Sequence, residues 1–495
     1  MPVTSNWRNN DVWIKGLLLA AAIAATVLAC SSEPGDPRPS ILLVVIDTLR
    51  ADAVSAYGAV EGTTPVFDEL AAEGLLYHHA FAPSPWTLPS HASLFTGLRV
   101  DRHGVGFGGQ MGLSTELTTI AERLRDAGYQ TAGFSENPLV SAPFGIDQGF
   151  EQFAAVTIDD LINRPKNAGN LQFDIVEKVR AFAAQRDRSR PYFLFANLLD
   201  PHEPYRDREV NRFLASGVSV GSFWTRSRLK QTAELICKRL PSSADIEILH
   251  GLYLGGVAEA DAKLGRIVEI ARESTSADRL IVVATSDHGE QFGEHRLLDH
   301  EFSVRGPVLK IPLAVHGLAD TEPGRINEPV ELADIAASVM HWAGIGVPPD
   351  WAGRPLPTRP SETARGGTDL LALYSDEPLR APGKWDPGLK PAMNRNKKRK
   401  ACGPNDRVFG TMAAITRWPF KLIWFERYPA ELYDLSWDPM ERSDLAAIQP
   451  EVGAPLLEEV RRMIREVGLG DGTPGDAAVP STAELEVLRG LGYVE

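Results

Sequence analysis

Continuous hydrophobic runs that end in an acidic residue recur along the first two thirds of the chain. The segments ILLVVID (41–47), RPYFLFANLLD (190–200) and RLIVVATSDHG (279–289) share this design. Strands buried on both faces of a parallel sheet have such uniform hydrophobicity. YQTAGFS (129–135) is a further predicted strand, and it follows a helical pattern at 116–128 that stops at a glycine. This alternation predicts an α/β fold, a large doubly wound and mainly parallel sheet flanked by helices.

The pattern changes in the last third of the chain. The segment 346–405 is rich in Pro, Gly and charged residues and contains the basic run NRNKKRK (394–400). A solvated loop is favoured for that run over contact with an anionic substrate or lipid headgroups. Hydrophobic order returns in WPFKLIWF (418–425) and ELYDL (431–435), two predicted paired strands, and in an amphipathic helical pattern at 456–468. A small C-terminal α+β subdomain is therefore expected.

The sequence pattern of the first 30 residues predicts that the protein is exported. Arg8 and Lys15 precede GLLLAAAIAATVLA (16–29), a hydrophobic run that is short for a membrane span and fits a signal peptide. The following VLAC is similar to a bacterial lipobox, in which Cys30 becomes the lipidated first residue of the mature protein. An ordinary signal peptide with an incidental cysteine is the alternative. We expect an exported bacterial lipoprotein, periplasmic or at the cell surface, that is membrane-anchored through Cys30.

The length of 495 residues suits a large α/β domain with a smaller one attached. We predict five divisions: a signal peptide (1–29), a polar tether (30–39), a catalytic domain (40–345), a variable loop-rich segment (346–405) and the C-terminal subdomain (406–495).

Charge and cysteine content narrow the class of partner. The formal net charge is −14, which argues against nucleic acid because phosphate binding needs a basic surface. Besides Cys30, the chain has Cys237 and Cys402, which could form one disulfide in an oxidising compartment. The spacing contains no Cys/His zinc motif. The cysteines therefore carry no information about catalysis.

Polar residues follow each predicted strand, at the edge where open parallel sheets bind ligands. A single strand-end acid most often caps a turn or a helix. Four strands that all release acids, amides or imidazoles at one edge favour a functional site instead. In chain order these residues are Asp47 and Thr48, Glu136 and Asn137, Asp200 and His202, and Asp287 and His288.

Asp47, Asp287 and His288 are candidate ligands of one divalent cation. Two carboxylates and an imidazole suit Zn²⁺ or Mn²⁺ better than Ca²⁺, which prefers an all-oxygen cage. Thr87, in WTLPSHASLFTG (86–97), is the fourth candidate ligand, because Pro89 and the final glycine place it at the start of a short helix. A divalent cation there would lower the pKa of its hydroxyl and activate it as a nucleophile. A simple helix N-cap is the alternative for Thr87.

These motifs together resemble the sulfatase family of the alkaline phosphatase superfamily. The resemblance rests on five segments in their order and spacing, namely LLVVIDTLRADAVSAYG, TLPSHASLFTG, FANLLDPHEPY, TSDHGEQFGEHRLLDHEFSV and PFKLIWF with ELYDLSWDPMERSDLA. It implies a large α/β domain, a smaller C-terminal domain, and hydrolysis of sulfate or phosphate esters at a metal site.

The resemblance also assigns site residues. It places Asp47, Asp287 and His288 on metal-ligand positions, although His288 stands where many arylsulfatases have Asn and Thr48 where they have a second Asp. It places His202 on the substrate-binding histidine and His300 near the substrate-binding lysine. FSENP (134–138) replaces the GKWH-like segment of arylsulfatases, and Asn137 substitutes there.

The nucleophile motif departs most from the family. Sulfatases carry Cys or Ser-x-Pro-x-Arg, whose first residue becomes formylglycine, whereas this chain has Thr87, with His91 in place of the arginine. Formylglycine is therefore not expected. Related phosphodiesterases and phosphoethanolamine transferases use an unmodified Thr on phosphorus. Asp200, His202 and His300 are left as substrate contacts or as ligands of a second metal ion, and metal-free contacts are favoured.

The leading hypothesis is a metal-dependent hydrolase of small-molecule or glycan esters with Thr87 as nucleophile and His202 or His300 at the leaving oxygen. His91, Asn137 and Asp200 are the substrate-binding candidates. Phosphorus esters are favoured over sulfates, because a plain alkoxide lacks the elimination route by which formylglycine releases sulfate. The alternatives are an envelope phosphoethanolamine-type transferase and a non-catalytic lipoprotein that binds an anionic glycan.

Overall fold

The structure is a computed structural model that describes residues 36–59, 62–107, 110–157, 173–205, 212–214, 242–275, 279–300, 302–359, 369–375 and 410–467. Cys30, Cys237, Cys402, the signal peptide and the basic run 394–400 lie outside the described residues. Within the described residues, no helix has the length and apolar character needed to cross a membrane.

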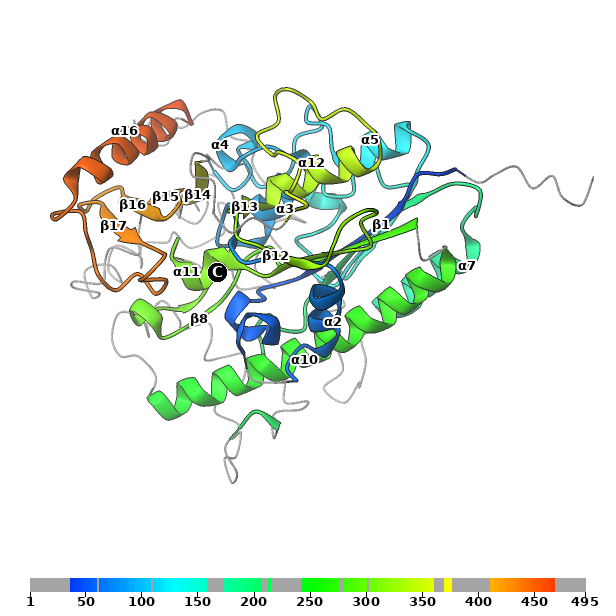
Figure 1. Ribbon diagram of the computed structural model, residues 1–495, viewed down its shortest axis with the longest axis horizontal. Helices are drawn as coiled ribbons and strands as arrows, with labels where there is room; N and C mark the ends of the chain where they lie inside the picture. Colours follow the sequence, from blue (N-terminus) through cyan, green and yellow to red (C-terminus); the bar gives the residue numbers. More distant parts are fainter. Residues whose placement is uncertain are drawn as a thin grey trace, which may run out of the picture.

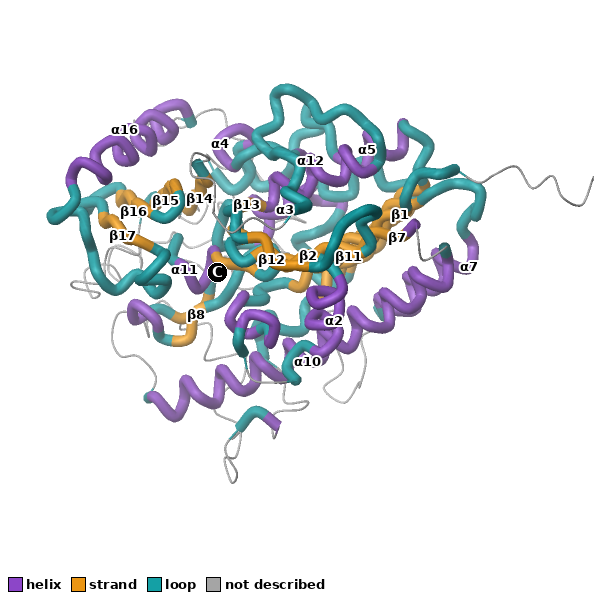
Figure 2. The backbone as a smooth tube through the Cα atoms, viewed as in Figure 1, coloured by secondary structure: helices purple, strands orange, loops and turns teal. Residues whose placement is uncertain are grey.

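A mixed, mainly parallel sheet of eight strands forms the centre of the molecule (Figures 1 and 2). The strand order is β12-β2-β11-β7-β1-β6-β4-β5. All neighbouring pairs are parallel except those of β11, which runs antiparallel to β7 and β2. The predicted fold class is confirmed. The bounds are β1 (Ser40–Ile46), β2 (Leu75–Tyr77), β4 (Gln130–Ser135), β5 (Gln152–Ala155), β6 (Tyr192–Leu198), β7 (Leu280–Thr285), β11 (Leu313–His316) and β12 (Gly324–Ile326).

Helices cover both faces of this sheet (Figure 1). One face carries α3 (Thr87–Thr96), α5 (Ile120–Asp126) and α12 (Leu332–Trp342), and the other carries α2 (Pro65–Glu73), α7 (Ile175–Gln185) and α10 (Ser243–Ser274). Successive side chains of a strand point to opposite faces. Ile41, Leu43 and Val45 of β1 therefore pack in the core that contains α3, whereas Leu42, Val44 and Ile46 pack in the core that contains α10. This double burial explains the uniform hydrophobicity of the strand.

The C-terminal part of the chain forms a second, antiparallel sheet in the order β14-β15-β16-β17. Its strands are β14 (Leu370–Tyr374), β15 (Met412–Arg417), β16 (Phe420–Phe425) and β17 (Glu431–Asp434), and α16 (Pro450–Glu466) packs against them. The predicted pairing of the last two strands is present. The strand β14 lies within the segment 346–405, which was expected to be rich in loops.

Helix ends differ from the sequence expectations. The helix expected at 116–128 is α5 alone, which begins after the N-cap Thr119, and the helix expected at 456–468 begins at Pro450.

Short elements complete the fold: α4 (Val100–His103), α11 (Gly306–Leu309), β3 (Ala80–Phe81), β8 (Gln291–Phe292), β9 (Leu298–Asp299), β10 (Lys310–Ile311), β13 (Val330–Glu331) and the 3-10 helices η1 (Ala51–Ala53), η2 (Ser55–Tyr57), η3 (Ala142–Phe144) and η7 (Glu294–Arg296).

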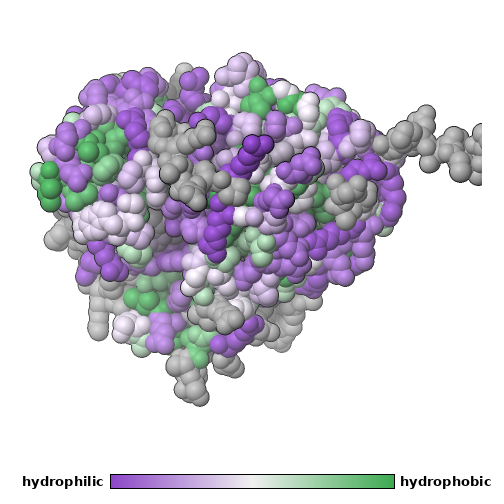
Figure 3. Space-filling model, viewed as in Figure 1, coloured by the Kyte–Doolittle hydropathy of each residue, from purple (hydrophilic) through white to green (hydrophobic). Residues whose placement is uncertain are grey.

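The surface seen in Figure 3 is mainly hydrophilic, with hydrophobic residues in small groups. Among the described residues, the large hydrophobic side chains that stand well exposed are Trp437 (58%) and Ile448 (72%), both in the C-terminal part. Isolated exposed hydrophobic residues of this kind are common on protein surfaces.

Candidate active site

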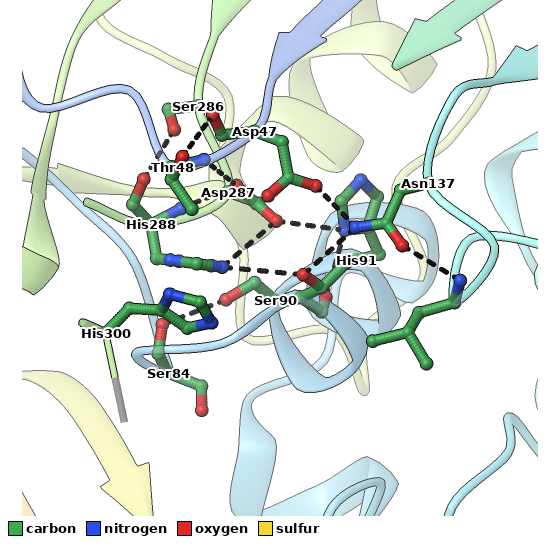
Figure 4. A network of polar contacts seen from close by, with 12 residues as sticks. Asp47, Thr48, Ser84, Ser90, His91, Asn137, Ser286, Asp287, His288 and His300 are labelled. Atoms are coloured by element: carbon green, nitrogen blue, oxygen red, sulfur yellow. Dashed lines mark hydrogen bonds and ion pairs between the residues drawn. The ribbon is translucent and has the colours of Figure 1, made fainter. Parts of the chain in front are cut away.

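The candidate site lies at the carboxyl ends of four adjacent strands, β7, β1, β6 and β4. Asp47 directly follows β1, Asn137 follows β4, and Asp287 and His288 follow β7. Because these strands are parallel neighbours, their ends meet at one edge of the sheet, and Figure 4 shows the side chains facing one another. The edge expected from the sequence is therefore present.

Thr87 faces these residues from the first position of α3. Trp86 is the N-cap residue of α3, so Thr87 does not cap this helix. The alternative interpretation of Thr87 as a simple helix N-cap is therefore wrong. Its Oγ1 lies 3.5 Å from His288 Nε2 and 3.4 Å from Asn137 Nδ2. The helix ends at Gly97, whose φ of 66° is left-handed. Thr87 is fully buried and points toward the candidate metal ligands.

The two carboxylates each have one anchored oxygen and one oxygen without a hydrogen bond. Asn137 Nδ2 donates to Asp47 Oδ2 over 2.7 Å, and the backbone N–H groups of Thr48 and His288 donate to Asp287 Oδ1 over 3.2 and 2.9 Å. Asp47 Oδ1 and Asp287 Oδ2 are buried and accept no hydrogen bond. Unsatisfied buried carboxylate oxygens are costly unless an ion or a water completes them.

His288 completes this group. Its Nδ1 donates to the Gly289 carbonyl over 2.9 Å, so the neutral ring directs the lone pair of Nε2 toward Asp287 Oδ2, 3.5 Å away. Burial, and then the neighbouring His300, hold the pKa of His288 well below its usual value. Burial also raises the pKa of Asp287, although His91 and three backbone N–H groups oppose this. A neutral imidazole beside two orphaned carboxylate oxygens is a donor set that fits a divalent cation.

The three candidate ligands Asp47, Asp287 and His288 offer atoms that lie within 4.8 Å of one another. A second group of this kind consists of Glu290, Asp299 and His300. The hairpin of β8 and β9 brings these three together, because Gln291 and Asp299 are register partners. His300 Nδ1 lies 2.9 Å from Asp299 Oδ1 and 3.5 Å from Glu290 Oε1.

The predicted substrate residues are distributed around this centre. The ring of His300 lies 4.6 Å from that of His288 and 5.1 Å from that of His202, measured between centroids. His91 lies one turn after Thr87 on α3: it is fully buried, its Nδ1 contacts the Thr87 carbonyl at 2.9 Å, and it packs on Phe195.

Asp200, a further predicted substrate residue, contacts a lysine of α10. Both of its carboxylate oxygens contact Lys263 Nζ, at 2.9 and 2.8 Å, and Glu136 Oε1 contacts the same ammonium at 2.6 Å. The described residues hold no metal-ligand group made of Asp200, His202 and His300. Lys263, Glu290 and Asp299 were not expected from the sequence. Glu136 was noted at a strand end but received no role.

Residues 39–345 match the family model Sulfatase. The chain belongs to the sulfatase family. The chain is 24% identical to arylsulfatase K of Bos taurus, over 90% of the chain and 88% of that protein. It is 23% identical to the N-acetylglucosamine-6-O-sulfatase of Bacteroides thetaiotaomicron, over 91% of each protein.

The fold of the chain is similar to that of a phosphonate monoester hydrolase of Agrobacterium radiobacter. The TM-score is 0.67 at 22% identity, with 87% of this chain and 96% of the other covered. The chain is an ester hydrolase of a metal-dependent family, and its Asp47–Asp287–His288 group is a candidate site for the ion. Sulfatases and phosphonate monoester hydrolases both occur among the similar proteins.

Proposed function

We propose that this sulfatase-family enzyme hydrolyses phosphorus esters, with unmodified Thr87 as its nucleophile. The substrate would be a phosphomonoester, a phosphodiester or a phosphonate monoester. One observation carries the proposal. The hydroxyl of Thr87 lies within 3.5 Å of His288 Nε2, at the point where Asp47 and Asp287 present oxygens without hydrogen bonds. Threonine has no route to the formylglycine aldehyde, so the chemistry at this position has to use the hydroxyl itself.

Asp47, Asp287, His288 and Thr87 would hold one divalent cation, Zn²⁺, Mn²⁺ or Ca²⁺. Such an ion supplies a Lewis acid that lowers the pKa of the Thr87 hydroxyl and polarises a substrate oxygen. The protein's own part is to orient Thr87, since α3 fixes its backbone and Asn137 Nδ2 lies 3.4 Å from its Oγ1.

The reaction proceeds in two displacements at phosphorus. Thr87 Oγ1 gives its proton to solvent and forms a bond to phosphorus while the bond to the leaving oxygen breaks. His202 or His300 gives that oxygen a proton. Water then attacks the phosphothreonine and gives one proton back to that histidine, while the bond between Thr87 Oγ1 and phosphorus breaks. Thr87 Oγ1 takes up a proton from solvent, and the anion is released. A sulfothreonine would need the same direct attack by water, without the elimination that an aldehyde hydrate allows.

A panel of nitrophenyl phosphate, nitrophenyl phosphodiester, nitrophenyl phosphonate and nitrophenyl sulfate tests this proposal. We expect turnover of a phosphorus ester and a loss of at least about 1000-fold in kcat for Thr87→Ala. Thr96→Ala, at the other end of α3, is the matched control. Hydrolysis that survives in Thr87→Ala, or exclusive turnover of the sulfate, would contradict the proposal.

A sulfate ester is the second candidate substrate. Two solved structures with similar folds support it, since they are described as a protein bound to D-glucosamine-2-N,6-O-disulfate and as a 2-O glycosaminoglycan sulfatase. The same panel distinguishes the two ester classes.

We also propose that the enzyme acts as an exported lipoprotein, anchored through Cys30. The lipobox-like VLAC at residues 27–30 supports this. Cys30→Ser is expected to move the protein from the membrane fraction to the soluble periplasmic or extracellular fraction. Mass spectrometry of the N-terminal peptide would reveal the acyl chains, and an unmodified N-terminal peptide would refute the anchor.

A further inference from the structure

Lys263 of α10 lies between the ends of two strands that carry site residues. Its Nζ contacts Glu136 Oε1 at 2.6 Å and both oxygens of Asp200 at 2.9 and 2.8 Å. All three side chains are mostly buried, with exposed fractions of 15% for the lysine, 7% for Glu136 and 6% for Asp200. Glu136 directly precedes Asn137, and Asp200 lies two residues before His202.

Glu136 links the two strand ends a second time. Its Oε2 accepts a hydrogen bond from Leu199 N–H over 3.1 Å, and its own N–H donates to the Asn197 carbonyl over 3.0 Å. The helix α10 also touches the turn directly at Gly256, where an added Cβ would lie 2.3 Å from the Asp200 carbonyl oxygen. Gly256 and Lys263 are seven residues apart, two helical turns, so one face of α10 holds this turn at two points.

Stability alone does not account for such an arrangement. One ammonium neutralises only one of the two carboxylates, and burial together with Asp200 raises the pKa of Glu136 even though Lys263 opposes this. Buried ion pairs often stabilise a fold no better than uncharged side chains of similar size, and their best-supported use is to fix one arrangement of the elements they join. Here the joined elements are the segments that lead to Asn137 and His202.

We propose that Lys263 is a positioning residue of the active site, which holds the ends of β4 and β6 in register through Glu136 and Asp200. This inference rests on the proposed function, in which Asn137 and His202 act beside Thr87. Without the lysine, the two carboxylates repel each other and the strand ends separate. Asn137 Nδ2 then leaves its contacts with Asp47 and Thr87.

The experiment separates positioning from stability with two variants. Lys263→Met is expected to lower both the Tm and the activity, because it leaves two buried carboxylates without a cation. The triple variant Lys263→Met, Glu136→Gln, Asp200→Asn removes every charge of the group and is expected to recover most of the lost Tm. Its kcat is expected to stay reduced by about 100-fold, since displacements of about 1 Å at a site have effects of this size. Arg266→Met, on the exposed side of the same helix, is the control.

A crystal structure of the triple variant provides a readout that does not depend on activity. The 2.7 Å contact between Asn137 Nδ2 and Asp47 Oδ2 is expected to be broken or lengthened. A triple variant with wild-type kcat, or one that retains this contact, would overturn the proposal. Activity that persists in Thr87→Ala overturns the nucleophile assignment alone, because the comparison of Lys263 variants and the crystal structure do not depend on which atom attacks.

Discussion

Asn137 Nδ2 donates a 2.7 Å hydrogen bond to Asp47 Oδ2, which joins the end of β4 to the end of β1. The orientation of the amide is set by the backbone, because Asn137 Oδ1 accepts a hydrogen bond from Leu139 N–H over 2.9 Å. Its nitrogen must therefore face Asp47 and Thr87. The consequence is that Asp47 Oδ2 is occupied and Asp47 Oδ1 is the oxygen left for a ligand.

Asn137→Ala is expected to lower kcat/KM by about 10–100-fold, the range for residues that orient a metal ligand. The amide supports both Asp47 and Thr87, so its loss affects the nucleophile and the ion together. Steady-state kinetics on the best ester of the panel measures the effect. Gln148→Ala is a matched control, since that amide bonds only backbone carbonyls away from the site. Unchanged kinetics in Asn137→Ala would show that Asp47 keeps its orientation without the amide.

Removal of the divalent cation by a chelator is expected to abolish activity, and one added equivalent is expected to restore it. Asp287→Asn replaces the orphaned carboxylate oxygen with a neutral amide, which lowers the affinity for the cation. Elemental analysis of the dialysed protein measures the content directly. Asp350→Asn, an exposed change of the same type, should retain the ion. Metal content equal to that of wild type in Asp287→Asn would remove Asp287 from the ligand set.

The residues that follow the strands of the site were predictable, because a strand buried on both faces appears in the sequence as a continuous hydrophobic run. The run 41–46 is hydrophobic at every position and Asp47 follows it, so the sequence predicts both the strand and its end. Parallel neighbours then have to deliver their following residues to one edge. This arrangement brings together Asp47, Asn137, Asp287 and His288. The sequence also predicted the start of α3, where Thr87 lies 3.4 Å from Asn137 Nδ2.

The contacts of Lys263 and Asp200 were not predictable in the same way. Lys263 belongs to a 32-residue helix, where a lysine ordinarily marks the solvent face. Its partners are 127 and 63 residues away in the chain, so only the packing of α10 on the sheet reveals the contact. Asp200 was expected in the substrate site because it follows a strand, and its contact with Lys263 depends on tertiary packing that the strand pattern does not predict. The strand β14 was overlooked because Pro- and Gly-rich sequence surrounds it.

Lys421→Met is expected to destabilise the protein by about 3 kcal/mol. Lys421 of β16 is buried, and its Nζ contacts Glu441 Oε1 at 2.6 Å. Glu441 also accepts a hydrogen bond from the Gly306 N–H of α11, so the pair joins the C-terminal sheet to the large domain. The effect stays at the low end for a broken buried pair, because Arg305 remains 3.6 Å from Glu441 Oε2.

Chemical denaturation measures this loss. The double variant Lys421→Met, Glu441→Gln should regain part of the stability, because it removes the uncompensated carboxylate. Arg427→Met is the exposed control on the following turn. A Lys421→Met variant as stable as wild type would show that Arg305 alone satisfies Glu441.

His103 is expected to make the fold sensitive to acid. The ring is buried, its Nδ1 accepts a hydrogen bond from Val105 N–H over 3.1 Å, and its Nε2 lies 2.9 Å from Ser93 Oγ of α3. Protonation of Nδ1 would break the bond to Val105. Burial lowers the pKa of His103 to about 3, although the nearby Asp101, which pairs with Arg99, opposes this shift.

The sign of the pH dependence follows from these values. The unfolded chain protonates His103 near its ordinary pKa of 6.5, so between pH 6.5 and about 3 the unfolded state binds one proton more than the folded state. The stabilisation by the neutral ring is therefore complete above pH 6.5 and falls as the pH decreases, by at most about 1.4 kcal/mol per pH unit. His103→Gln removes this term. Denaturation at pH 7, 6 and 5 should show the stability of wild type relative to the variant decreasing at each step, whereas a constant difference would mean that His103 keeps the same protonation in both states.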